Sequence, residues 1–466
     1  MSDFDARAKA LRAALQTQKS FDLLDRPVFF GGRRALFVLV DGFVKDDLFE
    51  KIMEFFYALK QDDPCFESAQ HFLDRAVPYC EAALEPDLDK AVTAVLSGQT
   101  ALLIEGFSQL ILLDIRTYPQ RDTAEPEKDK VFRGSHDGFV ETMVLNCALI
   151  RRRIRSTALR MEAYSLGSAS QTDVVLCYMD DRVDRAVLDK LHEKLAHPGD
   201  VDALTMNQES LAELLLPHKW YNPFPRFKYT ERPDAAAAQV LEGDVVLLVD
   251  NSPAAMTLPS SLFDIMEEAN DYYFPPLTGS YLRLIRFAVL LAMLLLTPLW
   301  LLVNRNPALL PTSISFLIPA EAPRVPLFWQ LLILELGIDG LKLATLNTPS
   351  MMTTSLSVIA GIVVGDFAVQ SGWFSAEAML YMAFVALGAF NQPSFELGYA
   401  VKFMRIALLI LVTLGGLWGL LGGLLAVLVI LLRCKTFSGR SYLYPLIPLD
   451  LRVLRQKLFR PSIRRQ

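Results

Sequence analysis

The feature that most constrains this 466-residue chain is a run of 27 residues, 406–432, without a single charged side chain. As a continuous helix rising about 1.5 Å per residue, the run would be longer than the roughly 30 Å hydrocarbon core of a bilayer and would cross it with tilt. More apolar runs precede it from Phe287 onward. The sequence therefore predicts an α-helical, polytopic membrane domain in the last third of the chain.

The number of apolar segments raises a question of topology. We expect four to five of them in a membrane domain at 281–435, and the five candidates are residues 287–303, 327–346, 356–373, 378–401 and 406–432. An odd number of crossings cannot return the chain to its starting side, so either one segment is re-entrant or broken, or the two ends of the chain lie on opposite sides. The two candidates are the charged segment at 327–346 and the segment interrupted by Asn391-Gln392-Pro393.

Charge is distributed unevenly and predicts the orientation. Residues 433–466 hold nine Lys and Arg against one Asp, whereas residues 1–286 hold 32 basic and 45 acidic side chains. Cytoplasmic flanks collect basic residues, and cationic segments are drawn to anionic lipid headgroups, so we place the basic tail at 436–466 in the cytosol. Because the first twenty residues lack the apolar core of a signal peptide, we expect the N-terminal region there too.

The region before the membrane domain contains an internal repeat. A strand followed by an acidic turn and a helix occurs twice, with Asp41 matching Asp180, and a helix followed by glycine and a strand occurs twice, with Gly98 matching Gly243. Repeats of this kind indicate duplicated supersecondary units. The alternative is that strand-turn-helix units simply resemble one another.

The repeat predicts the fold class: an α/β region of two tandem, similar cytosolic subdomains, 1–156 and 157–280, followed by the helical membrane domain. A basic run near their boundary, Arg151-Arg152-Arg153-Ile154-Arg155, is typical of a salt-bridged helix face. We expect it to contact the other subdomain or the acidic front of a neighbouring subunit.

Three ionisable residues in the membrane domain are candidates for a site. Glu335, Asp339 and Lys342 are spaced at i, i+4 and i+7, on one face of a helix. Charges at bilayer depth are costly and normally face a bundle interior or water. One interpretation is an ion path, with Asp366 and the hydroxyl-rich residues 345–357 as further lining. The other is a salt bridge internal to the helix.

Glycines at helical spacing predict close packing in the same domain. Gly415, Gly419 and Gly423 share one face, and Gly361 and Gly365 repeat the spacing. Small residues at this spacing let helices approach closely, within or between subunits.

Known catalytic and cofactor motifs are missing from the sequence. It has no P-loop, no G-x-G-x-x-G, no G-x-S-x-G and no H-E-x-x-H, and its five cysteines show no C-x-x-C spacing. We therefore expect neither an enzyme nor a bound cofactor or metal, and no nucleic-acid partner.

Four long stretches resemble one known family. They are EPEKDKVFRGSHDGFVETM at 125–143, YNPFPRFKYTERPD at 221–234, DYYFPPLTGSYLRLIR at 271–286 and NQPSFELGYAVKFMR at 391–405. In this order they resemble the A subunits of spore germination receptors, the GerA family. With the two subdomains, the resemblance covers nearly the whole chain.

The resemblance implies a multi-pass protein of the spore inner membrane that takes part in germination, with its N-terminal domain in the cytosol. It further implies a homo-oligomer that conducts ions, works with other germination membrane proteins and releases cations or amplifies their release. The alternatives are a non-conducting scaffold and a nutrient-receptor A subunit that relays a signal to partner proteins.

Overall fold

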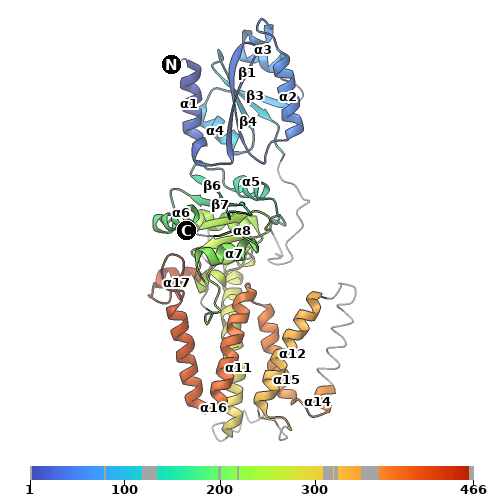
Figure 1. Cartoon of the computed structure of the whole chain (residues 1–466), viewed down its shortest axis with the longest axis vertical. Helices are drawn as coiled ribbons and strands as arrows, with labels where there is room; N and C mark the ends of the chain where they lie inside the picture. Colours follow the sequence, from blue (N-terminus) through green and yellow to red (C-terminus); the bar gives the residue numbers. More distant parts are fainter. Residues whose placement is uncertain are drawn as a thin grey trace. The chain divides into compact units, whose positions relative to one another are not determined.

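The computed structural model describes residues 3–77, 80–117, 134–197, 201–217, 220–307, 318–319, 324–347 and 367–460. The chain forms two compact units (Figure 1). Unit 1 comprises Met1–His218 and Phe227–Pro259, and unit 2 comprises Lys219–Arg226 and Ser260–Gln466.

The first sheet of unit 1 has the strand order β1-β2-β4-β5-β3, and all its neighbouring strands are antiparallel. Its strands are β1 (Leu23–Phe30), β2 (Arg33–Val40), β3 (Glu81–Glu85), β4 (Thr100–Ile104) and β5 (Leu110–Asp114). Helices α1 (Asp3–Leu15) and α4 (Leu88–Leu96) cover one face, and α2 (Asp46–Ala58) and α3 (Ala69–Arg75) cover the other.

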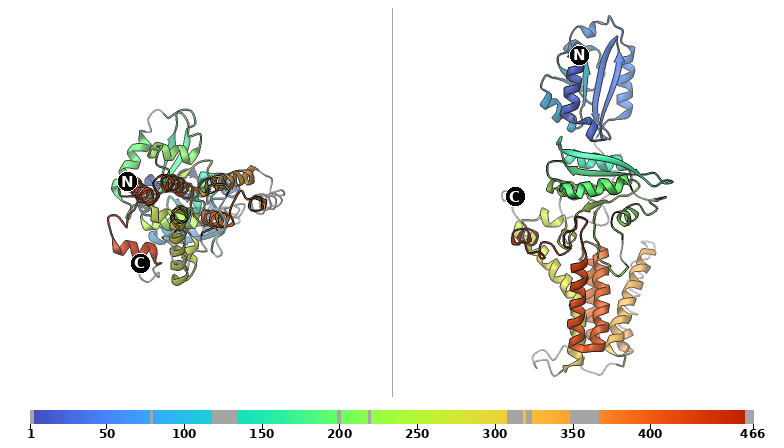
Figure 2. Two further views of the ribbon diagram at one scale, coloured as in Figure 1. Left: turned by 90° about the horizontal axis from the view of Figure 1, so that it is seen from below. Right: turned by 60° about the vertical axis from the view of Figure 1, so that its left-hand side comes forward.

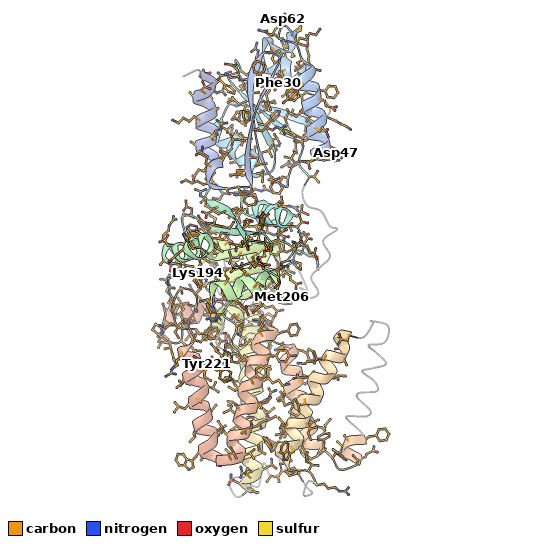
Figure 3. The ribbon with its side chains drawn as sticks, in the orientation of Figure 1. Phe30, Asp47, Asp62, Lys194, Met206 and Tyr221 are labelled. Atoms are coloured by element: carbon orange, nitrogen blue, oxygen red, sulfur yellow. The ribbon has the colours of Figure 1, made fainter. Side chains whose placement is uncertain are left out.

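The apolar strand β2 explains why this sheet has helices on both faces. Its side chains alternate between the two layers, so that Leu36 and Val38 pack with α1 and α4 while Phe37 packs with α2. Phe30, at the end of β1, joins the layer under α2 and α3 (Figure 3). A strand that is apolar on both faces requires both to be covered.

The second sheet has the order β6-β7-β9-β10-β8, again with antiparallel neighbours. Its strands are β6 (Leu159–Leu166), β7 (Thr172–Met179), β8 (Lys228–Thr230), β9 (Val245–Val249) and β10 (Ala255–Leu258). Helices α5 (Met143–Arg153) and α8 (Pro233–Glu242) share a core with β6, β7 and β9, and α6 (Arg185–Ala196) packs against β6 and α7 (Asn207–Leu215).

The sequence repeat corresponds to two sheets with the same strand order. Asp41 directly follows β2 and Asp180 directly follows β7. Gly98 and Gly243 end α4 and α8 with φ angles of 100° and 104°. Only glycine adopts this conformation without strain, which is why it recurs where a helix must stop and turn into a strand.

A buried joint connects the two sheets within unit 1. Residues 20–22 run along the free edge of β6, where the Phe21 amide donates to the Met161 carbonyl at 3.0 Å and the Met161 amide donates to Ser20 Oγ at 3.0 Å. Arg151 Nε donates to Asp22 Oδ2 at 2.7 Å, and its side chain is 0% exposed. The expected subdomain contact of the basic run is confirmed for Arg151. Helix α5, which carries Arg151, precedes the expected boundary at residue 156 yet packs on the second sheet.

Unit 2 is helical (Figure 2). Its elements are α9 (Leu262–Ile265), α10 (Asn270–Tyr273), α11 (Pro276–Arg305), α12 (Leu327–Asn347), α14 (Ala368–Gln370), α15 (Ala376–Phe390), α16 (Phe395–Arg433) and α17 (Leu451–Leu458). Among the described helices, α11 and α16 are long and apolar enough to cross a membrane, and α15 is apolar but shorter. These helices indicate association with a membrane.

The longest helix, α16, is a hairpin. Gly416 has φ 55° and ψ −128°, outside the helical region. Beyond it the chain reverses, because Gly419 lies against Leu411 and Gly423 lies against Leu408. A straight helix would separate these pairs by about 12 Å and about 22 Å. The expected single crossing by residues 406–432 is therefore wrong: the run turns back in its middle, where adjacent glycines allow a conformation that other residues avoid.

The interrupted segment is also divided. Helix α15 ends at Phe390, and α16 begins at Phe395 after Ser394, whose side chain accepts from the Leu397 amide at 3.2 Å. Pro393 disfavours a helical conformation at the residue before it. Of the two candidates for a broken segment, the one with Asn391-Gln392-Pro393 is broken, whereas α12 is continuous.

Candidate functional site

Two acids predicted for the site face two cations of a different helix. Glu335 and Asp339 lie on α12, and Lys402 and Arg405 lie on the first half of α16. Arg405 Nε donates to Glu335 Oε1 at 2.6 Å, Lys402 Nζ is 3.6 Å from Glu335 Oε2, and Lys402 also pairs with Asp339. We call these four residues the charge cluster.

The charge cluster is largely shielded from solvent. The side chains of Glu335 and Arg405 are each 3% exposed. Arg405 Nη1 also donates to the Met293 carbonyl of α11 at 2.8 Å, and Lys402 Nζ donates to the Glu335 carbonyl at 3.2 Å. One arginine thus connects α11, α12 and α16. Because an unpaired buried charge is strongly destabilising, the pairing on both sides is what allows these groups to be buried.

Lys342, the third predicted residue, occupies a different environment. Its Nζ lies over two aromatic rings, 5.0 Å from the centroid of Phe390 and 5.9 Å from that of Tyr399, at cation–π distance. The acids that a salt bridge internal to α12 would assign to Lys342 are instead paired with α16. The pairing therefore runs between helices rather than along one.

A cavity of about 30 Å³ adjoins the charge cluster, with room for about one water molecule. Its lining includes Glu335, Asp339, Lys342, Lys402 and Arg405. Three cations against two carboxylates leave an excess of one positive charge. In this arrangement the cavity does not favour a cation, unlike the acidic face that the sequence predicts.

The remaining predicted residues are glycines of α16 and residues that the structure does not describe. Asp366, Gly361 and Gly365 lie outside the described residues, as do residues 348–357 of the expected hydroxyl-rich lining. Gly415 precedes the turn of α16, and Gly419 and Gly423 pack against the first half of the same helix.

Sequence reasoning missed Lys402 and Arg405, although a signal was present. They are the two basic residues of an otherwise apolar stretch and are spaced by three, so they share a helix face. A pair of cations one turn apart matches a pair of acids one turn apart on α12.

A second group of ion pairs holds α10 and α17 to the start of α11. Asp271, which is fully buried, pairs with Arg283 at 3.3 Å and with Arg286 at 2.7 Å. Arg283 Nη1 donates to the carbonyls of Gln456 and Lys457 of α17, both at 3.1 Å. The two arginines therefore hold other parts of the chain to α11.

Lys457 completes this group from the side of α17. Its Nζ lies 2.6 Å from Asp264 Oδ1 and 3.2 Å from Glu267 Oε2. Burial alone lowers the pKa of Lys457, but the carboxylates of Glu267 and Asp264 outweigh burial and raise the pKa well above its ordinary value. Burial likewise raises the pKa of Asp264, but Lys457 and the hydrogen bonds of Ser261 lower it overall.

The chain is similar to known proteins. The sequence profile of the Bacillus/Clostridium GerA spore germination protein family matches residues 9–466. The chain is 39% identical over 375 residues to stage V sporulation protein AF of Bacillus subtilis, covering 80% of this chain and 76% of that protein. It is 26% identical to spore germination protein KA of Bacillus subtilis, covering 84% and 72%.

A solved structure is also similar. It is the N-terminal domain of the A subunit of the Bacillus megaterium spore germinant receptor GerK3, with a TM-score of 0.41 and 19% identity, covering 54% of this chain and 92% of that chain.

Proposed function

Since this chain belongs to the GerA family of spore germination proteins, we propose that it is a non-enzymatic protein of the spore inner membrane that conducts ions as an oligomer during germination. Unit 1 lies in the cytosol, and the helices of unit 2 cross the bilayer. The described segments α11, α12, α15 and the two halves of α16 account for five crossings, and the sequence predicts a sixth at 356–373. An even number returns the basic tail to the cytosolic side.

The observation that supports conduction is the charge cluster. Ionisable side chains at bilayer depth are rare, and by default they indicate an ion path or a switch. Here four of them meet between two helices of unit 2, next to a cavity large enough for water. Apolar residues of the same size would hold α12 and α16 together without the cost of desolvating charges.

The pairing supports assigning the described arrangement to a closed state. Glu335 and Asp339 are neutralised by Arg405 and Lys402. Lys342, which also lines the cavity, adds one positive charge that repels a cation. Cations pass only when the acids separate from α16 and face water. The gate is therefore the contact between α12 and α16.

A flux measurement tests the proposal. The full-length protein in liposomes is compared with Glu335→Gln/Asp339→Asn, which keeps the side-chain size and removes both negative charges. Potassium flux should fall at least tenfold in the variant while the oligomer on a sizing column is unchanged. Glu377→Gln, on α15 and outside the cluster, is the matched control and should conduct like the wild type. Equal flux from an intact double variant would remove these acids from the path.

The complete pairing of the acids favours a second candidate function, a non-conducting scaffold. In that case the cluster only joins helices, and unit 1 gathers partner germination proteins. The wild-type oligomer would then show no flux, and the double variant would lose assembly rather than conduction. The same liposomes and sizing column distinguish the two functions.

A further inference from the structure

The short helix α17 is fixed beside the first turns of α11. The Arg460 amide donates to Ser280 Oγ at 3.0 Å, and Arg283 donates to the last carbonyls of α17 at 3.1 Å. Lys457 adds its ion pair with Asp264. Figure 1 shows α17 at the end of the bundle where α16 ends. These contacts place α17 beside residues 280–283 of α11.

That position corresponds to the headgroup layer. The uninterrupted apolar part of α11 begins at Phe287, four residues after Arg283, a rise of about 6 Å. The polar layer on each side of a hydrocarbon core is about 5–8 Å thick. When α11 crosses the bilayer, α17 lies among the headgroups.

The outward surface of this segment combines apolar and basic side chains. Leu449 is 62% exposed, Leu451 70% and Phe459 48%, and between them Arg452 and Arg455 are exposed. Large apolar residues in such a density are costly in water, whereas an interfacial helix places them at the acyl-chain boundary with its basic residues at the headgroups. The inward residue Lys457 is already paired, so it does not belong to this surface.

We propose that the surface of residues 446–459 is a binding site for anionic phospholipid headgroups. Arg452 and Arg455 bind the phosphates, and Leu449, Leu451 and Phe459 insert at the acyl-chain boundary. The positive balance of residues 433–466, nine basic against one acidic, matches a negatively charged leaflet. The effect of bound lipid on α17 reaches α11 through Arg283, because this arginine belongs to α11 and donates hydrogen bonds to α17.

An environment-sensitive thiol label at position 449 tests this site in the full-length protein. Four native cysteines are buried, so Leu449→Cys with Cys80→Ser gives one reactive thiol. The labelled protein is placed in nanodiscs of phosphatidylcholine alone or with phosphatidylglycerol. Arg452→Gln/Arg455→Gln removes two exposed charges of the site. Lys90→Gln/Lys190→Gln removes two exposed lysines of unit 1 and is the matched control.

The label should become buried in lipid when phosphatidylglycerol is present. At about 1 kcal/mol per basic residue, the ratio of buried to exposed label should fall about 30-fold in the arginine variant and stay unchanged in the lysine variant. The proposal is overturned if burial is the same without phosphatidylglycerol or without the arginines. It is equally overturned if the label is shielded in detergent as protein concentration rises, since that surface would then bind a second copy. Neither readout requires conduction.

Discussion

Two buried groups of charges in this molecule use the same chemistry in different ways. At the joint of unit 1, Arg151 and Asp22 form one pair, and Arg151 also donates to Ser20 and to the Ser156 carbonyl. In the charge cluster of unit 2, two carboxylates meet two cations beside a cavity, and Lys342 adds a further positive charge. The charges of the joint are balanced, whereas the cluster together with Lys342 carries one excess positive charge.

The difference indicates which of the two can change. Opening the joint would leave a fully buried guanidinium and carboxylate without compensation, so it serves as a fixed connection. Together with Lys342, the residues around the cavity include more cations than acids, and the cavity offers a place for water. When the helices rearrange there, each acid can exchange its cation for another cation or for water, as a gate requires.

The largest loss of stability is expected when the buried ion pair of the joint is removed. Asp22→Ala leaves Arg151 buried without its partner and should lower the free energy of unfolding of the full-length protein by about 3–5 kcal/mol. Asp25→Ala is the control, because its pair with Arg12 is partly exposed and contributes at most about 1 kcal/mol. Hydrogen exchange of the strands of unit 1 measures both. Equal effects would show that the joint is not special.

The glycines of α16 test whether the hairpin holds the cation side of the cluster. At Gly419 a Cβ would meet the Leu411 carbonyl, whereas at Gly422 it meets nothing within 4 Å. Gly419→Ala should cost about 1–3 kcal/mol by overpacking, and Gly422→Ala should be neutral or slightly stabilising. Thermal unfolding in detergent compares them. A continuous helix would tolerate both substitutions alike.

The partly exposed ion pair of Lys457 and Asp264 should have an intermediate effect on stability, limited to a defined range of pH. The lowered pKa of Asp264 means that its contribution is present above about pH 4 and is lost as pH falls through the folded-state pKa. The raised pKa of Lys457 means that its contribution is present below about pH 10 and is lost as pH rises further. Exchange protection of α17 should therefore be flat from pH 5 to 9, after correction for intrinsic exchange, and fall in acid. A loss near neutral pH would contradict the pairing.

The smallest effect is expected for Lys342. Because the ion pairs of the acids are with α16, Lys342→Ala removes chiefly the contact with Phe390 and Tyr399 and should cost about 0.5–1 kcal/mol. Lys402→Ala, which removes a partner of two acids, is the comparison and should cost more. The free energies of unfolding of both variants, measured in the same detergent, give the two losses. A larger loss for Lys342→Ala would restore the salt bridge internal to α12.

How much the sequence predicts depends on whether the signal is local. The recurrence of Asp41 at Asp180 and of Gly98 at Gly243 reflects local turn geometry. It predicts two similar subdomains, and the structure has two sheets of the same strand order. The sequence does not predict the hairpin of α16, because the length of an apolar run does not show whether the chain reverses within it. The adjacent glycines at 415 and 416 were the available signal.

The candidate site shows the same limit. Helical spacing placed Glu335 and Asp339 on one face, and the structure gives both a common neighbour in Lys402. Their partners come from residues more than sixty positions away in the chain, which spacing within one helix cannot identify. Lys342 was the nearest cation in sequence but not in space.

A double-mutant cycle on Glu335 and Arg405 tests the central claim most directly, because that claim assigns the buried acid of α12 to a cation of α16. Glu335→Leu and Arg405→Leu each leave a partner buried and should each cost about 3 kcal/mol or more, whereas the double variant removes both charges and should cost far less than their sum. The coupling is read from unfolding in detergent, with potassium flux measured on the same samples. Strong coupling confirms the pairing between helices. Additive losses would contradict it and leave Glu335 an independent acid of the path.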